Sequence, residues 1–188
     1  PLQGKRAYVA GWTTQPYSIE EIKREFDQGK ATGIGLITGV WSNSGGLVWV
    51  DIDGTDAIKD LEELAGAPIS GAFPPTLTIS SGKPDRQRML FSVPAAKLNL
   101  LPDKATIKIG IPCFEILFRS RQGAIMGSHP DTEGYFTTQH GGFEFAKNPP
   151  EMPEWLYDAI AKAYPLNKYK KPVKSGIVTQ QVNLDYEE

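Results

Sequence analysis

Asp51 and Asp53 stand one residue apart at the end of an apolar run, residues 47–54. Side chains in a β-strand alternate between its two faces, so the two carboxylates share one face while Val50 and Ile52 point into a core. Two carboxylates at this spacing repel each other unless a cation lies between them, and their hard oxygen ligands suit Mg²⁺ or Mn²⁺. The pattern predicts a metal site, although a strand that ends in a polar Asp-Ile-Asp-Gly turn has the same sequence.

A basic loop between two predicted strands offers a counterpart to these acids. Lys83, Arg86 and Arg88 lie within six residues, and Ser81 adds a hydroxyl just before them. Ammonium, guanidinium and hydroxyl groups donate hydrogen bonds to phosphate oxygens, so the loop predicts a site for the triphosphate of a nucleotide. A solvated hairpin loop of the same composition is the alternative.

Glu115 brings a third carboxylate to the predicted site. It alternates with Phe114 and Ile116, so its side chain lies on the face opposite a core stripe. On one open sheet face, Glu115 would join Asp51 and Asp53 in a cluster that is costly without metal. Two divalent ions held there would clamp the attacking and leaving oxygens of an in-line phosphoryl displacement, which makes two-metal phosphoryl chemistry the leading hypothesis.

Ser128 and His129 form a further polar pair in a predicted loop, residues 127–130. A hydroxyl and an imidazole donate hydrogen bonds to a phosphate or to the sugar of a nucleotide. The pair equally fits an ordinary loop with a solvated histidine, and the sequence leaves both interpretations open.

Local periodicity predicts the elements that position these residues. Helices are expected at 18–28, 56–65 and 153–163, the first with Ser18 as its cap and Glu21 three residues on. Strands are expected at 33–38, 47–54, 76–80, 88–93, 114–119, 124–126 and 135–137. The pattern predicts an α+β domain over residues 1–165 with a mixed or antiparallel sheet, followed by a lysine-rich, weakly structured linker or tail over 166–188.

Composition limits the function classes. The net charge of −2 means that nucleic-acid binding has to rest on local patches, and a single cysteine excludes a Cys-rich zinc site. No stretch approaches the roughly 18 apolar residues that span a bilayer, and no signal peptide follows Pro1. We therefore expect no membrane partner and a cytoplasmic location. The start at proline favours a fragment of a longer protein.

Several short motifs follow one another along the chain. They are GIGLITG (33–39), LVWVDIDG (47–54), residues 76–93 with their SGKP loop, FEI (114–116), GSHP (127–130) and GY (134–135). With Gly11-Trp12 before the first helix, this succession resembles the N-terminal domain of the bifunctional DNA primase/polymerases (prim-pol) of plasmid, phage and bacterial replication proteins. The resemblance covers roughly residues 5 to 160.

This resemblance implies a domain of the archaeo-eukaryotic primase superfamily with an RRM-like catalytic sheet and flanking helices. The residues carried over are Asp51, Asp53 and Glu115 as metal ligands of the first and third motifs, Ser81 and Arg88 of the second motif, and Ser128 and His129 of a later Ser-x-His-like turn. The family's second motif usually ends in histidine where this chain has Arg88. A guanidinium holds a phosphate but does not titrate as an imidazole does, so nucleotide binding is expected there rather than acid/base work.

The expected function is that of a DNA primase and DNA polymerase. The enzyme would transfer nucleotides from dNTPs or NTPs onto a single-stranded DNA template with two Mg²⁺ or Mn²⁺ ions, and a helicase domain or protein would act downstream. One alternative is a non-catalytic module that binds single-stranded nucleic acid and stacks bases on aromatics such as Trp49. The other is a metal-dependent nuclease, because the same two-metal site can activate water.

Overall fold

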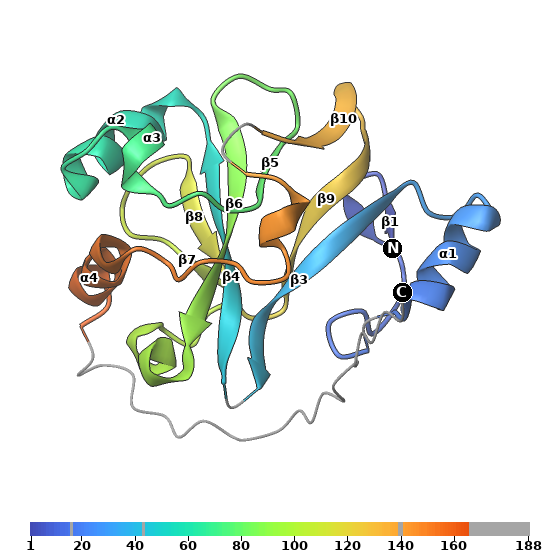
Figure 1. Ribbon diagram of the computed structural model, residues 1–188, viewed down its shortest axis with the longest axis horizontal. Helices are drawn as coiled ribbons and strands as arrows, with labels where there is room; N and C mark the ends of the chain where they lie inside the picture. The colour runs from blue at the N-terminus through green and yellow to red at the C-terminus, as the bar shows by residue number, and fades with distance from the viewer. Residues whose placement is uncertain (16, 43, 139–140, 166–188) are drawn as a thin grey trace.

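Figure 1 shows the protein as a computed structural model, which describes residues 1–15, 17–42, 44–138 and 141–165. The strands are β1 (Leu2–Gln3), β2 (Arg6–Ala7), β3 (Gly33–Ser42), β4 (Gly45–Asp53), β5 (Thr78–Ser80), β6 (Arg86–Pro94), β7 (Thr106–Ile107), β8 (Phe114–Leu117), β9 (Arg121–His129) and β10 (Thr132–Thr137). The helices are α1 (Ile19–Asp27), α2 (Thr55–Ala65), α3 (Ile69–Ala72) and α4 (Glu154–Ala163), with short 3-10 helices at Ala95–Leu100 and Phe143–Phe145. The predicted tail, 166–188, lies outside the described residues.

Six strands close on themselves to form a barrel. β3 pairs with β9, β9 with β10, β10 with β5, β5 with β6, β6 with β4, and β4 pairs again with β3. Every ladder between the described strands is antiparallel. The predicted α+β class and antiparallel sheet are therefore confirmed. The pairings do not form the open face that was expected, because the sheet closes.

The barrel closes because β3 pairs with two different neighbours along its length. Residues 33–38 pair with β9, and residues 39–42 pair with the start of β4. Gly39 has a φ of +142°, and the register shifts between Val40 and Ser42, so the strand bends between the two ladders. The far end of β4 continues past this contact and pairs with β8 through residues 49–52. The carboxylate end of β4 thus has a strand on each side.

Two apolar cores lie on the two faces of β4. Val48, Val50 and Ile52 are buried on the outer face, in a core shared with α2, α3 and α4, as the alternation predicts. The opposite face lies inside the barrel, where Trp49 is fully buried and its Nε1 donates a hydrogen bond to the Leu36 backbone oxygen at 3.1 Å. Both faces of β4 are therefore packed against apolar side chains up to Val50, and Asp51 is the first acidic residue of the strand.

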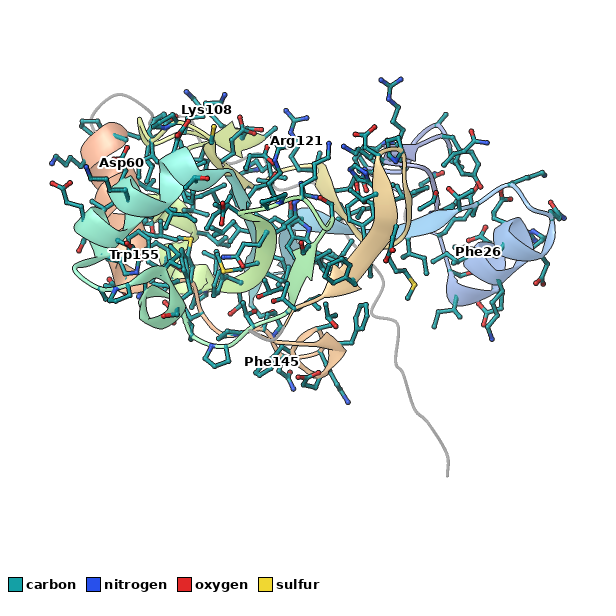
Figure 2. The ribbon with its side chains drawn as sticks, turned by 90° about the horizontal axis from the view of Figure 1, so that it is seen from above. Phe26, Asp60, Lys108, Arg121, Phe145 and Trp155 are labelled. Atoms are coloured by element: carbon teal, nitrogen blue, oxygen red, sulfur yellow. The ribbon has the colours of Figure 1, made fainter. Side chains whose placement is uncertain are left out.

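The three predicted helices are present close to their expected bounds. α1 begins with the predicted capping box, in which the Ser18 hydroxyl accepts from the Glu21 N–H and the Glu21 carboxylate accepts from the Ser18 N–H. Its apolar stripe does not enter a core, because Phe26 is exposed and Glu25 is the buried side chain. Figure 2 shows α1 with Phe26 at one end of the molecule and α2, α4 and Trp155 at the other.

Some local predictions are wrong. The expected loop at 127–130 is largely strand, since β9 runs to His129, which pairs with Thr132 of β10 across a short turn. β6 already begins at Arg86, which shortens the predicted basic loop, and α3 is not indicated by the sequence pattern. Within the described residues, no helix has the length and the apolar character needed to cross a bilayer.

Candidate functional site

The strand register brings the predicted acids and two of the predicted bases to neighbouring positions. Asp51 lies directly opposite Arg88 of β6 on one side and Glu115 of β8 on the other. Asp53, two residues further on, lies opposite Arg86. Side chains at directly opposite positions of antiparallel strands share a face and are neighbours. These five residues form what we call the charged cluster.

Asp51 is held by a two-point hydrogen bond. Nε and Nη2 of Arg88 donate to its two carboxylate oxygens at 3.1 and 2.8 Å, and only 13% of the Asp51 side chain is exposed. Burial raises the pKa of Asp51 above its usual value, with Asp53 and Glu115 adding to that effect and Arg88 opposing it. The guanidinium is therefore the group that favours the ionised carboxylate in this setting.

Gly123 of β9 leaves room for the Arg88 side chain inside the barrel. A Cβ at this position would lie 2.8 Å from Arg88 Cδ and 2.7 Å from Trp49 Nε1. Real Cβ atoms do not approach neighbours that closely, so the aliphatic part of Arg88 occupies space that only glycine leaves free. Asp51 thus holds the guanidinium of Arg88, and the aliphatic part of the side chain packs against Gly123 of β9.

The other two acids form exposed ion pairs. Arg86 Nη1 lies 3.6 Å from Asp53 Oδ1, and the two side chains are 45% and 58% exposed. Lys108 Nζ lies 2.7 Å from Glu115 Oε1, with 68% and 38% exposed. Exposed pairs of this kind contribute little and exchange partners easily. Each acid of the charged cluster is therefore balanced by a base, so the three carboxylates do not by themselves demand a metal.

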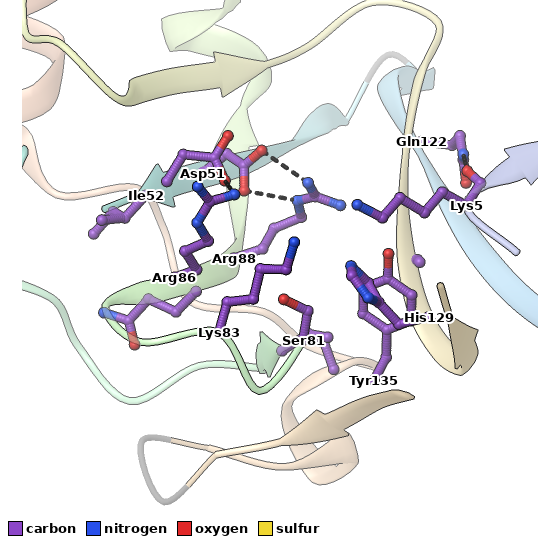
Figure 3. Close-up of a pocket in the computed structure, with 14 residues that line it drawn as sticks. Lys5, Asp51, Ile52, Ser81, Lys83, Arg86, Arg88, Gln122, His129 and Tyr135 are labelled. Atoms are coloured by element: carbon purple, nitrogen blue, oxygen red, sulfur yellow. Dashed lines mark hydrogen bonds and ion pairs between the residues drawn. The ribbon is translucent and has the colours of Figure 1, made fainter. Parts of the chain in front are cut away.

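A pocket of about 270 Å³ adjoins the charged cluster, and Figure 3 shows its residues as sticks. The charged members of its lining are Lys5, Lys83, Arg86, Arg88, Asp51 and Asp53. Four cations thus face two acids. Lys83 also pairs with Asp131 at 2.8 Å outside the lining. Such an excess of positive charge in a concave site favours an anionic ligand.

His129 lies in the wall of this pocket with a defined orientation. Its Nδ1 accepts a hydrogen bond from the Asp131 backbone N–H at 3.1 Å, so the neutral ring carries its proton on Nε2. The ring packs edge-on against Tyr135, with 5.5 Å between the ring centroids. Burial first, and then the charges of Lys5 and Lys83, lower the pKa of His129. The neutral imidazole therefore presents an N–H donor.

The structure brings most of the predicted site residues together. The pocket lining includes Asp51, Asp53, Ser81, Lys83, Arg86, Arg88 and His129. Glu115 adjoins Asp51 across β8 but does not contribute to the lining. Ser128 is exposed and does not contribute either, because neighbouring strand positions point to opposite faces.

The lining residues that sequence reasoning missed include Lys5, Gln122 and Tyr135. Lys5 sits between two strands of two residues each, which are too short to show an alternating pattern. Gln122 lies in a polar stretch between two expected strands, 114–119 and 124–126, so its position in β9 was not predicted. Tyr135 had an available signal, since it belongs to the Gly134-Tyr135 motif of the family resemblance.

Asp51, Asp53 and Glu115 carry the type of oxygen ligand that suits a divalent cation, but their carboxylates do not converge in the structure. No group of three His, Cys, Asp or Glu side chains in the described ranges lies close enough together to hold a metal ion. Asp53 and Glu115 are nevertheless accessible, and their present partners are long side chains in exposed pairs. Turning those two carboxylates toward Asp51 would give the hard oxygen ligands that Mg²⁺ and Mn²⁺ prefer.

Fold and site together define the class of protein. It is an α+β domain with a closed antiparallel barrel, and one end of the barrel combines strand-end carboxylates with a cationic pocket. The family model for the N-terminal domain of bifunctional DNA primase/polymerases matches residues 1–155, and the chain belongs to this family. The resemblance found in the sequence motifs is thereby confirmed. No curated protein and no solved structure matches the chain.

Proposed function

We propose that the domain is a nucleotidyltransferase, a DNA primase and polymerase that joins nucleotides on a single-stranded DNA template. The observation that carries the proposal is the register of β4, which sets Asp51 directly beside Glu115 and places Asp51 and Asp53 next to a cationic pocket. Acids next to a site for anions suit a reaction in which a hydroxyl attacks a metal-bound polyphosphate. Membership of the prim-pol family supports the same chemistry.

In this proposal Asp51, Asp53 and Glu115 hold two Mg²⁺ or Mn²⁺ ions. The bound ions would activate the attacking 3′-hydroxyl and offset the charge that develops on the α-phosphate and on the departing pyrophosphate. Arg86 and Lys108 then lose their carboxylate partners and are free to contact phosphate oxygens or solvent. These two side chains can change partner because their present ion pairs are exposed.

Arg88 would orient Asp51 and contact the substrate at the same time. A guanidinium has five N–H donors, and Arg88 uses two of its nitrogens on Asp51. The donors that are left serve a phosphate oxygen, which retains the nucleotide-binding role expected for this position. Ser81, Lys83 and the Nε2–H of His129 would complete the triphosphate site around it.

The two alternatives receive less support. A module that only binds single strands would stack bases on exposed aromatic rings, and Trp49 is fully buried inside the barrel. A nuclease would use the same acids, but the excess of cations in the pocket favours a ligand with several phosphates. The proposed reaction belongs to DNA replication in the cytoplasm, with a helicase domain or protein supplying the single-stranded template.

A primer-extension and priming assay tests the proposal. The domain is incubated with single-stranded DNA, labelled dNTPs or NTPs, and Mg²⁺ or Mn²⁺, with and without a primer. We expect product growth that stops in EDTA and in Asp51→Asn or Asp53→Asn. Asp60→Asn, an exposed change on α2, is the matched control and should leave the activity unchanged. Shortening of the labelled strand would favour a nuclease, and metal-independent binding without product would favour the binding module.

A further inference from the structure

Lys5 differs from the other cations of the pocket in forming no ion pair with an acid of the described residues. Within the described residues, Lys83, Arg86 and Arg88 each form an ion pair with an aspartate, whereas no carboxylate lies within ion-pair distance of Lys5. Lys5 and Arg88 both line the pocket, and Figure 3 shows the two side chains drawn among its lining residues. Two cations that face one pocket repel each other unless an anion lies between them. Lys5 is therefore the lining cation that can meet an anionic ligand without first giving up an ion pair of the described residues.

The hairpin that carries Lys5 is fixed to the barrel. β1 and β2 are joined by the two-residue turn Gly4-Lys5, with Gly4 at a φ of +59°. The Gly4 N–H donates to Thr32 Oγ1 at 2.8 Å, and Leu2 is buried and pairs with β3. The backbone oxygen of Lys5 accepts from Gln122 Nε2 at 3.0 Å. The turn is thus tied to both β3 and β9, and the Lys5 backbone is held in place beside the pocket.

The four cations of the pocket form two groups, according to whether they contact the aspartates of β4. Arg86 and Arg88 contact the aspartates of β4 directly. Lys5 and Lys83 instead lie near His129, whose pKa their charges help to lower after the larger effect of burial. A ligand with one phosphate beside the acids would extend its further phosphates toward this second group. Lys5 and Lys83 are therefore the lining cations available to the far end of a polyphosphate.

We propose that Lys5 binds the terminal phosphate of the incoming nucleoside triphosphate and makes the site select triphosphates over monophosphates. The inference rests on the proposed function for the identity of the ligand. For the role of the residue it rests on the fixed hairpin and on the place of Lys5 in the pocket lining, where it forms no ion pair within the described part of the chain. Lys5 is a substrate-binding residue here, because it contacts the terminal phosphate and not the reacting phosphorus.

Equilibrium binding of the 188-residue chain tests this role. Inorganic triphosphate, a nucleoside triphosphate and the matching monophosphate are titrated against the wild type and against Lys5→Gln, Lys5→Arg and Arg6→Gln. Arg6 is the matched control, an exposed cation on the same hairpin that does not line the pocket. We expect Lys5→Gln to weaken both triphosphates about tenfold or more, as loss of a charge-assisted hydrogen bond does, and to change monophosphate binding by less than about twofold. Lys5→Arg should restore most of the affinity.

Three results would overturn the inference. Equal losses for the triphosphate and the monophosphate would show that Lys5 contributes only a general field, and an unchanged triphosphate affinity would remove it from the site. Stronger Lys5 dependence for an oligonucleotide with a 5′-triphosphate than for a free nucleotide would assign the lysine to a strand end instead. If Lys5→Gln binds the nucleoside triphosphate with unchanged affinity and still extends strands, this inference fails and the proposed function stands. Lys5-dependent triphosphate binding without any extension would contradict the proposed function alone.

Discussion

Arg88 donates one hydrogen bond to each carboxylate oxygen of Asp51, across the antiparallel ladder between β6 and β4. The sequence suggests a phosphate-binding role for Arg88, but its closest partner in the fold is the first acid of the predicted metal site. Asp51 is largely buried and its pKa is raised by that burial, so the ionised carboxylate depends on this contact. The Arg88–Asp51 pair therefore contributes to the stability of the barrel and also favours the ionised form of a proposed metal ligand.

Arg88→Gln should destabilise the domain by about 2 kcal/mol, because it leaves a mostly buried carboxylate without its cation. Urea unfolding followed by circular dichroism measures the change in the free energy of unfolding. Arg86→Gln is the matched control, since it removes an exposed pair on the neighbouring strand position and should cost less than about 1 kcal/mol. Adding Asp51→Asn to Arg88→Gln should recover part of the loss. Equal effects of the two arginine changes would contradict the importance of the Asp51 contact.

Gly123→Ala should cost about 1 to 3 kcal/mol, because its Cβ would overlap buried atoms of Trp49 and Arg88. Trp49 has no space to move, as it is fully buried and hydrogen-bonded to Leu36. Gly71→Ala in α3 is the control, since a Cβ there meets nothing within 4 Å. That change should be neutral or slightly stabilising. Thermal unfolding of the two variants compares them, and a tolerant Gly123 would mean that the barrel interior has room to adjust.

The features that the sequence predicted correctly depend on local patterns. The shared face of Asp51 and Asp53 follows from strand alternation, and the start of α1 follows from Ser18 and Glu21. The closure of the sheet could not be predicted in this way, because it requires β3 to pair with β4 on one side and β9 on the other. Those partners are set by tertiary packing, which leaves no periodic signal in β3 itself.

The arrangement of the site depended on the same non-local information. The loop composition around Arg88 indicated an anion site, but only the register with β4 shows that Asp51 lies opposite it. Lys5 was missed because its hairpin is recognisable only after Leu2 is seen to pair with β3. Residue types were thus predictable from the motifs, whereas the partner of each residue required the fold.

His129 should titrate below the ordinary histidine value of about 6.5. Because the pKa of the folded state is depressed, the unfolded chain binds more protons in this range, and His129 contributes a loss of stability as the pH falls below about 6.5. NMR titration of the imidazole signals measures the midpoint, with His129→Gln assigning the resonance. Lys5→Gln and Lys83→Gln should each raise the pKa of His129, since both remove a nearby positive charge. Arg6→Gln should not, and a uniform response of all three variants would contradict the proximity of Lys5.

Lys108→Gln should strengthen Mn²⁺ binding about two- to fivefold, because it frees Glu115 from an exposed ion pair and removes a positive charge beside the proposed metal site. Electron paramagnetic resonance of free Mn²⁺ measures the affinity without any need for activity. Glu115→Gln should have the opposite effect and weaken binding about tenfold or more. Lys59→Gln on α2 controls for the change in net charge and should leave the affinity unchanged. If Glu115→Gln and Lys108→Gln both leave Mn²⁺ binding unaltered, Glu115 is not a ligand and the metal site is limited to the two aspartates of β4.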